Sequence, residues 1–209
     1  MKPFRKHTGT VAPLDRVNVD TDQIIPKQFL KRIERTGFGQ FLFHNWRYSP
    51  EGDHIPHFVL HHPRYKQATI LVAGKNFGCG SSREHAVWAL ADHGFRVVVA
   101  SSFGDIFANN SLKNGLLTVR LSDDEVAQIM KRAHEIENYE LSVDLENRTI
   151  ADNHGFSAKF HIDDFAHHCL LHGLDDIGLT LEHESAIAAY EAKHPVRPEM
   201  QAIVPHASN

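Results

Sequence analysis

Cysteine is scarce in this chain of 209 residues, because only Cys79 and Cys169 occur. An iron–sulfur cluster needs three or four cysteine thiolates, so this chain alone cannot hold one. Long apolar runs are also missing: no segment approaches the roughly 18 apolar residues of a membrane span, and the N-terminal stretch has no apolar core of signal-peptide length. We therefore expect a cytoplasmic protein with reduced thiols and no membrane partner.

Charge of one sign is not in large excess. The chain has 22 lysines and arginines against 26 aspartates and glutamates, a formal net charge of -4. The basic residues are scattered along the sequence, without the stripe that is typical of nucleic-acid binding. We expect a small-molecule or protein partner and no nucleic acid.

Histidine is abundant, with 17 residues, but the spacing of metal ligands is lacking. No HExxH pattern occurs. His54, His57 and His61 fall at roughly helical intervals, yet Pro56 and Pro63 interrupt that segment. We interpret the histidines as part of a solvated surface and expect no metal site in this chain.

The apolar pattern predicts one α/β domain over residues 1–194 with mixed parallel and antiparallel sheets, followed by a disordered tail over 195–209. Strands are expected in KHTGTVAPL, ATILVA, FRVVVA and LLTVRL, and helices in EHAVWALADH, GDIFANNSLKNG, SDDEVAQIMKRAHEI, DDFAHHCLLHG and EHESAIAAYEAKH. The order ATILVA, EHAVWALADH, FRVVVA indicates a βαβ unit with parallel strands.

Three other segments are expected to form a turn, a surface excursion and a hairpin. The polar stretch DRVNVDTDQIIP is expected to be an irregular turn, because its Asn, Asp and Thr side chains compete for backbone hydrogen bonds. Proline, glycine and histidine suggest a surface excursion over residues 49–66. The alternating segment YELSVDLENRTIADNHGFSAKFHI is expected to form a hairpin.

The stretch NFGCGSSREHAVWAL, residues 76–90, carries the strongest functional pattern. Gly78 and Gly80 lack side chains, so backbone N–H groups there can approach a bound group closely, and the following helix start offers more of them. Arg83 puts a cation at the start of the predicted helix, where the positive end of the helix dipole opposes it. A bound negative group would make a cation at this position favourable. The pattern predicts an anion site with the Ser81 and Ser82 hydroxyls in its wall.

Simpler interpretations of this stretch stay open. Ser81 to Glu84 also spells a capping box, S-x-x-E, as does the stretch from Ser122 to Glu125. Neither a dinucleotide-binding GxGxxG nor a P-loop is present, and arginine favours a carboxylate at least as much as a phosphate. Cys79 could be a nucleophile, but no base is evident for it, so we favour a small packed thiol.

The motifs NVDTDQIIPKQFL, RTGFGQFLF, NFGCGSSREHAVWAL, FGDIFANNSLKNGLL and GLDDIGLTL resemble, in this order, those of the aconitase superfamily, and within it the small subunits of isopropylmalate dehydratases. The resemblance covers nearly the whole chain. It implies a swivelling β/β/α domain like the C-terminal domain of aconitases, and a large-subunit partner that carries a [4Fe-4S] cluster. It also implies interconversion of 2-isopropylmalate and 3-isopropylmalate through isopropylmaleate, in leucine biosynthesis.

The resemblance assigns roles to individual residues. Ser81 matches the superfamily's catalytic serine, which as an alkoxide removes a proton next to a carboxylate. Ser82 and Arg83 match positions that hold a substrate carboxylate, with Gly80 contributing to the same site. Asp22 matches an acid that orients active-site groups, including an arginine, for which Arg35 is a candidate.

Three alternatives remain from the sequence. The same chemistry could act on another small acid, such as homoaconitate or a methylated malate; Phe29, Leu30 and Ile33 suit an isopropyl group but equally suit core packing. The chain could be a free-standing module that binds a nucleotide or anionic metabolite. It could also be an enzyme complete in itself, with Cys79 as nucleophile.

Overall fold

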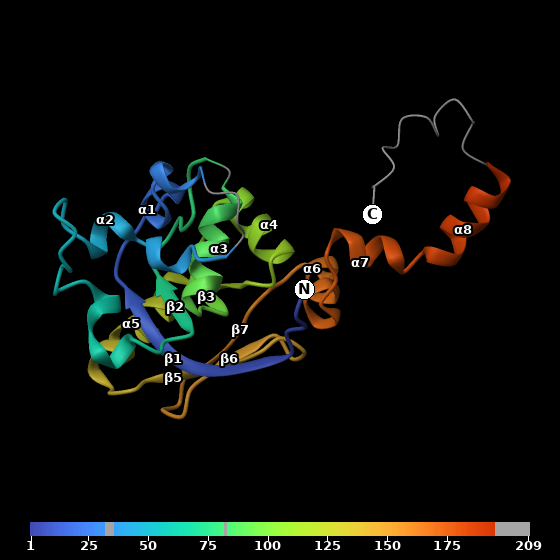
Figure 1. Ribbon diagram of the computed structural model, residues 1–209. Coiled ribbons are helices and arrows are strands. Elements are labelled where there is room, and N and C mark those ends of the chain that lie inside the picture. Colours follow the sequence, from blue (N-terminus) through green and yellow to red (C-terminus); the bar gives the residue numbers. More distant parts are fainter. Residues whose placement is uncertain (32–35, 82, 195–209) are drawn as a thin grey trace. The chain divides into compact units, whose positions relative to one another are not determined.

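The computed structural model describes residues 1–31, 36–81 and 83–194. The chain forms two compact units, Met1–Leu174 and Asp175–Asn209 (Figure 1). In the second unit the described part contains the helices α7 (Asp176–Leu181) and α8 (Glu184–Lys193), of which α8 was predicted and α7 was not. The single domain over residues 1–194 stays a prediction, and the tail over 195–209 lies outside the described residues.

The first unit is built on a seven-stranded sheet in the order β4-β3-β2-β1-β5-β6-β7. Its strands are β1 (Lys6–Leu14), β2 (Ile70–Ala73), β3 (Val97–Ala100), β4 (Leu117–Arg120), β5 (Glu140–Asp144), β6 (Thr149–Ala151) and β7 (Ser157–Lys159). Strand β1 belongs to both halves: its first part pairs antiparallel with β5 and its second part parallel with β2. The predicted α/β class with a mixed sheet is confirmed.

Helices and short 3-10 turns lie in the connections from β1 to β5, and α6 follows β7 (Figure 1). The helices are α1 (Thr21–Ile24), α2 (His44–Arg47), α3 (Glu84–His93), α4 (Asp105–Lys113), α5 (Asp123–Glu135) and α6 (Asp164–His172), and the 3-10 turns are Lys27–Phe29, Gly39–Phe41, Val59–His61 and Pro63–Tyr65. No helix in the described part is long and apolar enough to cross a membrane.

The central parallel strands β2 and β3 are apolar and buried at every position because both faces of the sheet are covered there. Leu71 of β2 faces the cluster that contains Val87 of α3, whereas its neighbours Ile70 and Val72 face the cluster that contains Ile129 of α5. All five side chains are fully buried. The sheet therefore holds α3 on one face and α5 on the other.

The predicted βαβ unit is confirmed, since β2 and β3 are adjacent and parallel and α3 connects them. Helix α3 ends at Gly94, whose φ of 115° is a left-handed conformation that glycine adopts without steric cost. The capping box at Ser122 and Glu125 also forms as predicted at the start of α5.

The predicted hairpin is wrong in strand number, because the segment forms the three strands β5, β6 and β7. The second reversal lies around Gly155, which has a φ of 85°. The sequence D-N-H-G at this point is a turn signal that the hairpin interpretation did not use. A three-strand meander buries one face along its length, with Ile150 and Ala158 pairing across β6 and β7.

Two further expectations need correction. Residues 49–66 are not simply a surface excursion, because Phe58, Leu60 and Tyr65 are buried against the core. The stretch expected to be an irregular turn contains α1, which Asp20 caps in a reciprocal capping box with Gln23. Here the polar side chains that disfavour a helix interior stabilise a helix start instead.

A buried ion pair ties α5 to the antiparallel half of the sheet. The Asp152 carboxylate is fully buried and pairs with Arg132. It also accepts hydrogen bonds from the Tyr139 hydroxyl at 2.6 Å and from the backbone amides of His154 and Phe156 at 2.7 and 2.8 Å. Burial alone would raise the pKa of Asp152, but these hydrogen bonds more than offset it and lower the pKa to about 2.

Asp152→Asn is expected to lower the free energy of unfolding at neutral pH by on the order of 1–3 kcal/mol, because it leaves buried donors poorly matched. Since the folded pKa lies below the unfolded value of about 3.9, the carboxylate stabilises the fold above pH 4 and this contribution is lost as the pH falls toward 2. Urea unfolding at pH 6 and pH 3 should therefore show a wild-type advantage that shrinks at the lower pH. An advantage that grew on acidification would contradict this account.

Candidate functional site

The glycine-rich loop after β2 lies among the loops that follow β1 and β3, all at the carboxyl ends of parallel strands. The amide of Gly78 donates to the carbonyl of Val19 at 2.7 Å, and the amide of Phe77 donates to the carbonyl of Ser102 at 3.0 Å. Ligands of open α/β sheets commonly bind at this edge. We call residues 76–83, together with the residues of α1 that contact them, the corner.

Glycine is needed at two positions of the corner. Gly78 has a φ of 71°, and a Cβ atom there would come within 2.2 Å of the Phe107 ring. Gly80 has a φ of 92° and is exposed, and its nearest neighbour would be the Cβ atom of Asp20 at 3.5 Å. The first glycine allows close packing, and the second allows a left-handed turn that leads the chain to Ser81.

Ser81 is exposed, and its backbone is held from α1. The hydroxyl of Thr21, which is only 2% exposed, donates to the carbonyl of Ser81 at 2.9 Å. The amide of Thr21 in turn donates to the carbonyl of Cys79 at 3.0 Å. Thr21 thus fixes the backbone on either side of Gly80.

The capping box expected from Ser81 to Glu84 does not form. Helix α3 begins at Glu84, and Arg83, with extended φ and ψ angles of -144° and 108°, is its N-cap without a side-chain capping hydrogen bond. The Glu84 carboxylate instead accepts from Nδ2 of Asn114 at 2.9 Å. Capping therefore does not account for Ser81, and Arg83 precedes the first turn rather than lying in it.

Arg83 is buried and forms an ion pair with Asp22, whose side chain is partly exposed. The Arg83 side chain is only 8% exposed. Nη1 contacts Oδ1 of Asp22, Nη2 donates to Oδ2 at 2.9 Å, and Nη1 also lies 3.5 Å from the carbonyl oxygen of Ile25. The hydrogen bond from Arg83 is the largest cause of the lowered pKa of Asp22, with burial opposing it and the charges of Arg83 and Lys27 adding to it.

Helix α1 therefore holds both ends of the segment from Ser81 to Arg83. Thr21 binds the Ser81 carbonyl, and the next residue, Asp22, binds the Arg83 guanidinium. The arrangement places an exposed hydroxyl two residues from a fixed cation. Such a site can bind an anion and stabilise negative charge on an oxygen atom.

The Cys79 thiol does not have the features of an activated nucleophile. Burial, and then the negative charge of Asp20, raise the pKa of Cys79, so the thiol stays protonated at neutral pH. His85 is directed elsewhere: its ring lies 4.7 Å from that of Trp88 and 5.2 Å from that of Phe38. These observations favour the packed thiol over the nucleophile.

Several residues that were predicted to act in the site are not among the contacts described for the corner. Ser82, Arg35 and Ile33 lie outside the described residues, so their roles stay predictions. Phe29 stacks on Phe41 at 4.1 Å and, like Leu30, packs against the core. Among residues 1–31, 36–81 and 83–194, no group of three or more His, Cys, Asp or Glu side chains could hold a metal ion.

Sequence reasoning missed Thr21 and a pair of asparagines. Asn18 and Asn76 have φ angles of 54° and 60°, and Nδ2 of Asn76 donates to Oδ1 of Asn18 at 2.9 Å. The pair links the loop after β1 to the first residue of the corner. Asparagine tolerates left-handed backbone better than most residues, and this preference was the available signal.

Family models match most of the chain. The Aconitase C-terminal domain matches residues 1–124, LeuD_N matches residues 127–164, and the C-terminal domain of the 3-isopropylmalate dehydratase small subunit matches residues 176–198. A solved structure titled 3-isopropylmalate dehydratase, from Methanocaldococcus jannaschii, aligns with a TM-score of 0.65 at 24% identity, covering 89% of this chain and 99% of its own. That similarity supports the fold.

Curated relatives are similar over nearly their full length. The 3-isopropylmalate dehydratase small subunit of Brevibacillus brevis is 59% identical over 193 residues, which cover 92% of this chain and 100% of the relative. The protein of the same name from Geobacillus kaustophilus is 58% identical over 198 residues, covering 95% of this chain and 100% of the relative. The chain therefore belongs to the family of 3-isopropylmalate dehydratase small subunits.

Proposed function

We propose that this chain is the small subunit of a two-chain hydro-lyase that interconverts 2-isopropylmalate and 3-isopropylmalate through isopropylmaleate, in the cytoplasm. It supplies a serine base and carboxylate-binding residues to an active site completed by the large subunit. The observation that best supports this role is the double attachment of the corner to α1, through Thr21 to Ser81 and through Asp22 to Arg83. Family membership supports the choice of substrate class.

Ser81 acts in this proposal as the base. Its alkoxide removes the proton from the substrate carbon next to a carboxylate, and the alcohol returns a proton when water is added back. Serine is a weak base unless its oxyanion is stabilised. The Arg83 charge and the amide groups that Gly80 leaves accessible supply a preorganised positive potential for that purpose.

Arg83 binds a substrate carboxylate while Asp22 orients it. The Asp22 carboxylate contacts the end of the guanidinium, through Nη1 and Nη2. A guanidinium has a second fork, formed by Nε–H and the other Nη2 hydrogen, which suits a second planar carboxylate. Ser82 adds a hydroxyl to this carboxylate site, and Arg35 is a second arginine for Asp22 to orient.

The [4Fe-4S] cluster is assigned to the large subunit. This chain has two cysteines, fewer than a cluster requires, so we assign the cluster to the partner. When bound, the cluster supplies a Lewis acid for the departing hydroxyl. The residues of this chain would act in the shared active site as base and as carboxylate ligands.

Isopropylmalate turnover should appear only when both chains are mixed. We would assay this chain alone, a cluster-bearing large subunit alone, and the mixture, under anaerobic conditions. Activity of this chain alone would contradict the proposal and favour a self-contained enzyme. With an intact cluster and a formed complex, failure on isopropylmalate but turnover of homoaconitate or a methylated malate would keep the chemistry and replace the substrate.

Thr21→Val is expected to lower kcat of the assembled enzyme by about three- to tenfold, because one hydrogen bond of roughly 1 kcal/mol no longer positions the Ser81 backbone. Valine keeps the shape of the buried side chain, so the fold and KM should change little. Thr21→Ser, which keeps the hydroxyl, should restore kcat. Thr8→Val is the matched control, since the Thr8 hydroxyl donates to Ser142 on the antiparallel half of the sheet; equal losses in both variants would remove the positioning role.

A further inference from the structure

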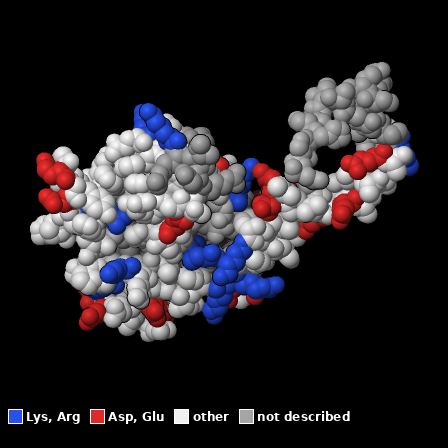
Figure 2. Space-filling model, viewed as in Figure 1, with Lys and Arg blue, Asp and Glu red and all other residues white. Residues whose placement is uncertain are grey.

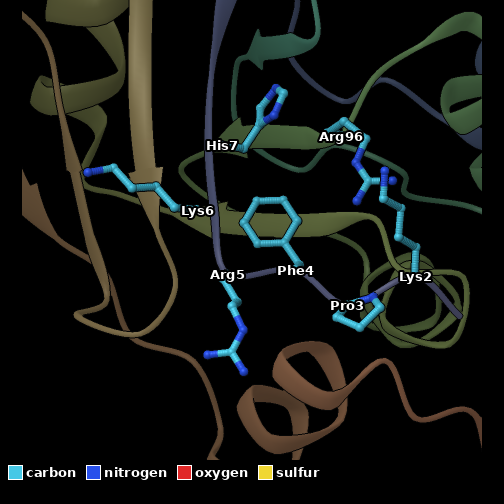
Figure 3. Close-up of a pocket in the computed structure, with 7 residues that line it drawn as sticks. All are labelled: Lys2, Pro3, Phe4, Arg5, Lys6, His7 and Arg96. Carbon is cyan, nitrogen blue, oxygen red and sulfur yellow. The ribbon is translucent and has the colours of Figure 1, made fainter.

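A basic hollow lies at the N-terminal end of the chain, away from the corner. It has a volume of about 280 Å³. Its walls are formed by Lys2, Pro3, Phe4, Arg5, Lys6, His7 and Arg96 (Figure 3). Arg96 directly precedes β3 and Lys6 begins β1, so the hollow lies at the amino ends of strands whose carboxyl ends carry the corner. We call it the N-terminal hollow.

No acidic side chain of the described residues lines the N-terminal hollow, and two of its cations are not balanced by carboxylates. Arg5 pairs with Glu146, and Lys6 lies opposite Asp144 in the register of β1 and β5. Lys2 and Arg96, in contrast, form no ion pair within the described part of the chain.

In Figure 3 the Lys2 and Arg96 side chains both extend on one side of Phe4, whereas Arg5 and Lys6 point away from them. Figure 2 shows Lys and Arg side chains gathered on the same face near the N-terminus.

The Arg96 backbone is held in place before any ligand arrives. Its amide donates to the carbonyl of Thr69 at 2.8 Å, and its carbonyl accepts from the amide of Leu117 at 3.1 Å. Its guanidinium lies over the ring of Phe4, 5.9 Å from the centroid. Phe4 is itself buried, and its amide donates to the carbonyl of Leu170 at 2.8 Å. A site whose groups are already ordered loses less entropy on binding.

A histidine forms a polar part of the wall beside Arg96. Nε2 of His7 lies 2.7 Å from Oγ1 of Thr69, and burial, followed by the charge of Arg96, lowers the pKa of His7. The contact depends on Gly9, because a Cβ atom there would lie 1.9 Å from Oγ1 of Thr69 and 2.9 Å from Nε2 of His7. The neutral ring therefore adds a polar group to the wall without adding another cation.

We propose that the N-terminal hollow binds a small oxyanion of the phosphate class, either inorganic phosphate or the phosphate group of a monoester. Two unbalanced cations suit a dianion better than a single carboxylate, and phosphate carries nearly two charges at neutral pH. The Arg96 guanidinium offers a planar fork for two phosphate oxygens, and the Lys2 ammonium supplies a point charge. The site is separate from the corner and does not depend on the proposed activity.

The test is a titration of the full chain with inorganic phosphate at pH 7.5 and constant ionic strength, followed by amide chemical shifts. Saturable shifts at residues 4–7 and at Arg96 are expected, with chloride at equal ionic strength producing none. Glycerol phosphate, titrated in parallel, separates the two sources: tighter binding than phosphate indicates an esterified ligand, and weaker binding the free ion. The absence of saturation by both, or shifts confined to the corner around Arg83, would overturn the proposal.

Charge variants locate the site. Lys2→Gln combined with Arg96→Gln should weaken phosphate binding by about tenfold or more, while Lys66→Gln combined with Lys159→Gln, which removes the same charge from exposed positions elsewhere, should change it less than about twofold. Because Arg96 packs on Phe4, Lys2→Glu provides a second variant that alters only an exposed side chain. It places a carboxylate in the hollow and should abolish saturation; phosphate binding unchanged in Lys2→Glu would refute the site.

Discussion

Replacing Ser81 with alanine is expected to lower kcat of the assembled enzyme by about a hundred- to ten-thousandfold, the range that a positioned base contributes. The Ser81 residue is exposed, and its contact with Thr21 runs through the backbone carbonyl, not the side chain. Removing the hydroxyl therefore deletes the proposed base without disturbing the contact that holds the loop. Steady-state kinetics with isopropylmalate, at a fixed ratio of the two subunits, measure the effect.

The control for Ser81→Ala is Ser157→Ala, which removes a hydroxyl from another exposed serine, on β7 in the antiparallel half of the sheet. Both variants should bind the large subunit with wild-type affinity in sedimentation or gel filtration. Turnover within about threefold of wild type in Ser81→Ala would rule out the base assignment, whereas weakened assembly would show that the residue serves the interface instead.

The local patterns that predicted the fold correctly are those in which one segment contains all the information. The first strand was predicted over KHTGTVAPL and is β1 from Lys6 to Leu14. The βαβ unit was found because its two strands are apolar throughout and Gly94 ends the helix between them. What these patterns could not provide is that β1 turns from an antiparallel neighbour to a parallel one along its length, since register depends on strands that are distant in sequence.

For the candidate site, too, local patterns were predictable from the sequence and contacts between distant segments were not. Glycine spacing, two hydroxyls and an arginine predicted an anion site at the corner from the sequence alone, and that role stays a prediction. The partner of Arg83 is Asp22, 61 positions away, and no spacing rule connects them. The capping box from Ser81 to Glu84 was a false signal, because the sequence signature fits S-x-x-E while the ion pair with Asp22 holds Arg83 in an extended conformation one residue before the helix. At this position the contact between distant segments, and not the local capping preference, determines the backbone conformation.

The same ion pair explains why lysine should not replace Arg83. Arg83→Lys is expected to raise KM for isopropylmalate and to lower kcat/KM by about ten- to a hundredfold, since charge-assisted hydrogen bonds contribute roughly 1.5–3 kcal/mol and an ammonium cannot form two forks. Lysine keeps the positive charge but has one nitrogen, so satisfying Asp22 leaves no planar pair of donors for the substrate. The separation of KM from kcat is the informative measurement.

Arg148→Lys is the matched control for Arg83→Lys, because Arg148 also pairs with an aspartate, Asp164, but in an exposed position far along the chain. That substitution should leave KM unchanged. If Arg83→Lys also kept the wild-type KM, the carboxylate role would be wrong and the guanidinium would serve only to hold Asp22 and α1. If kcat fell while KM stayed constant, Arg83 would act chiefly on the charge of the Ser81 oxygen, since an interaction made only in the transition state lowers kcat and not substrate affinity.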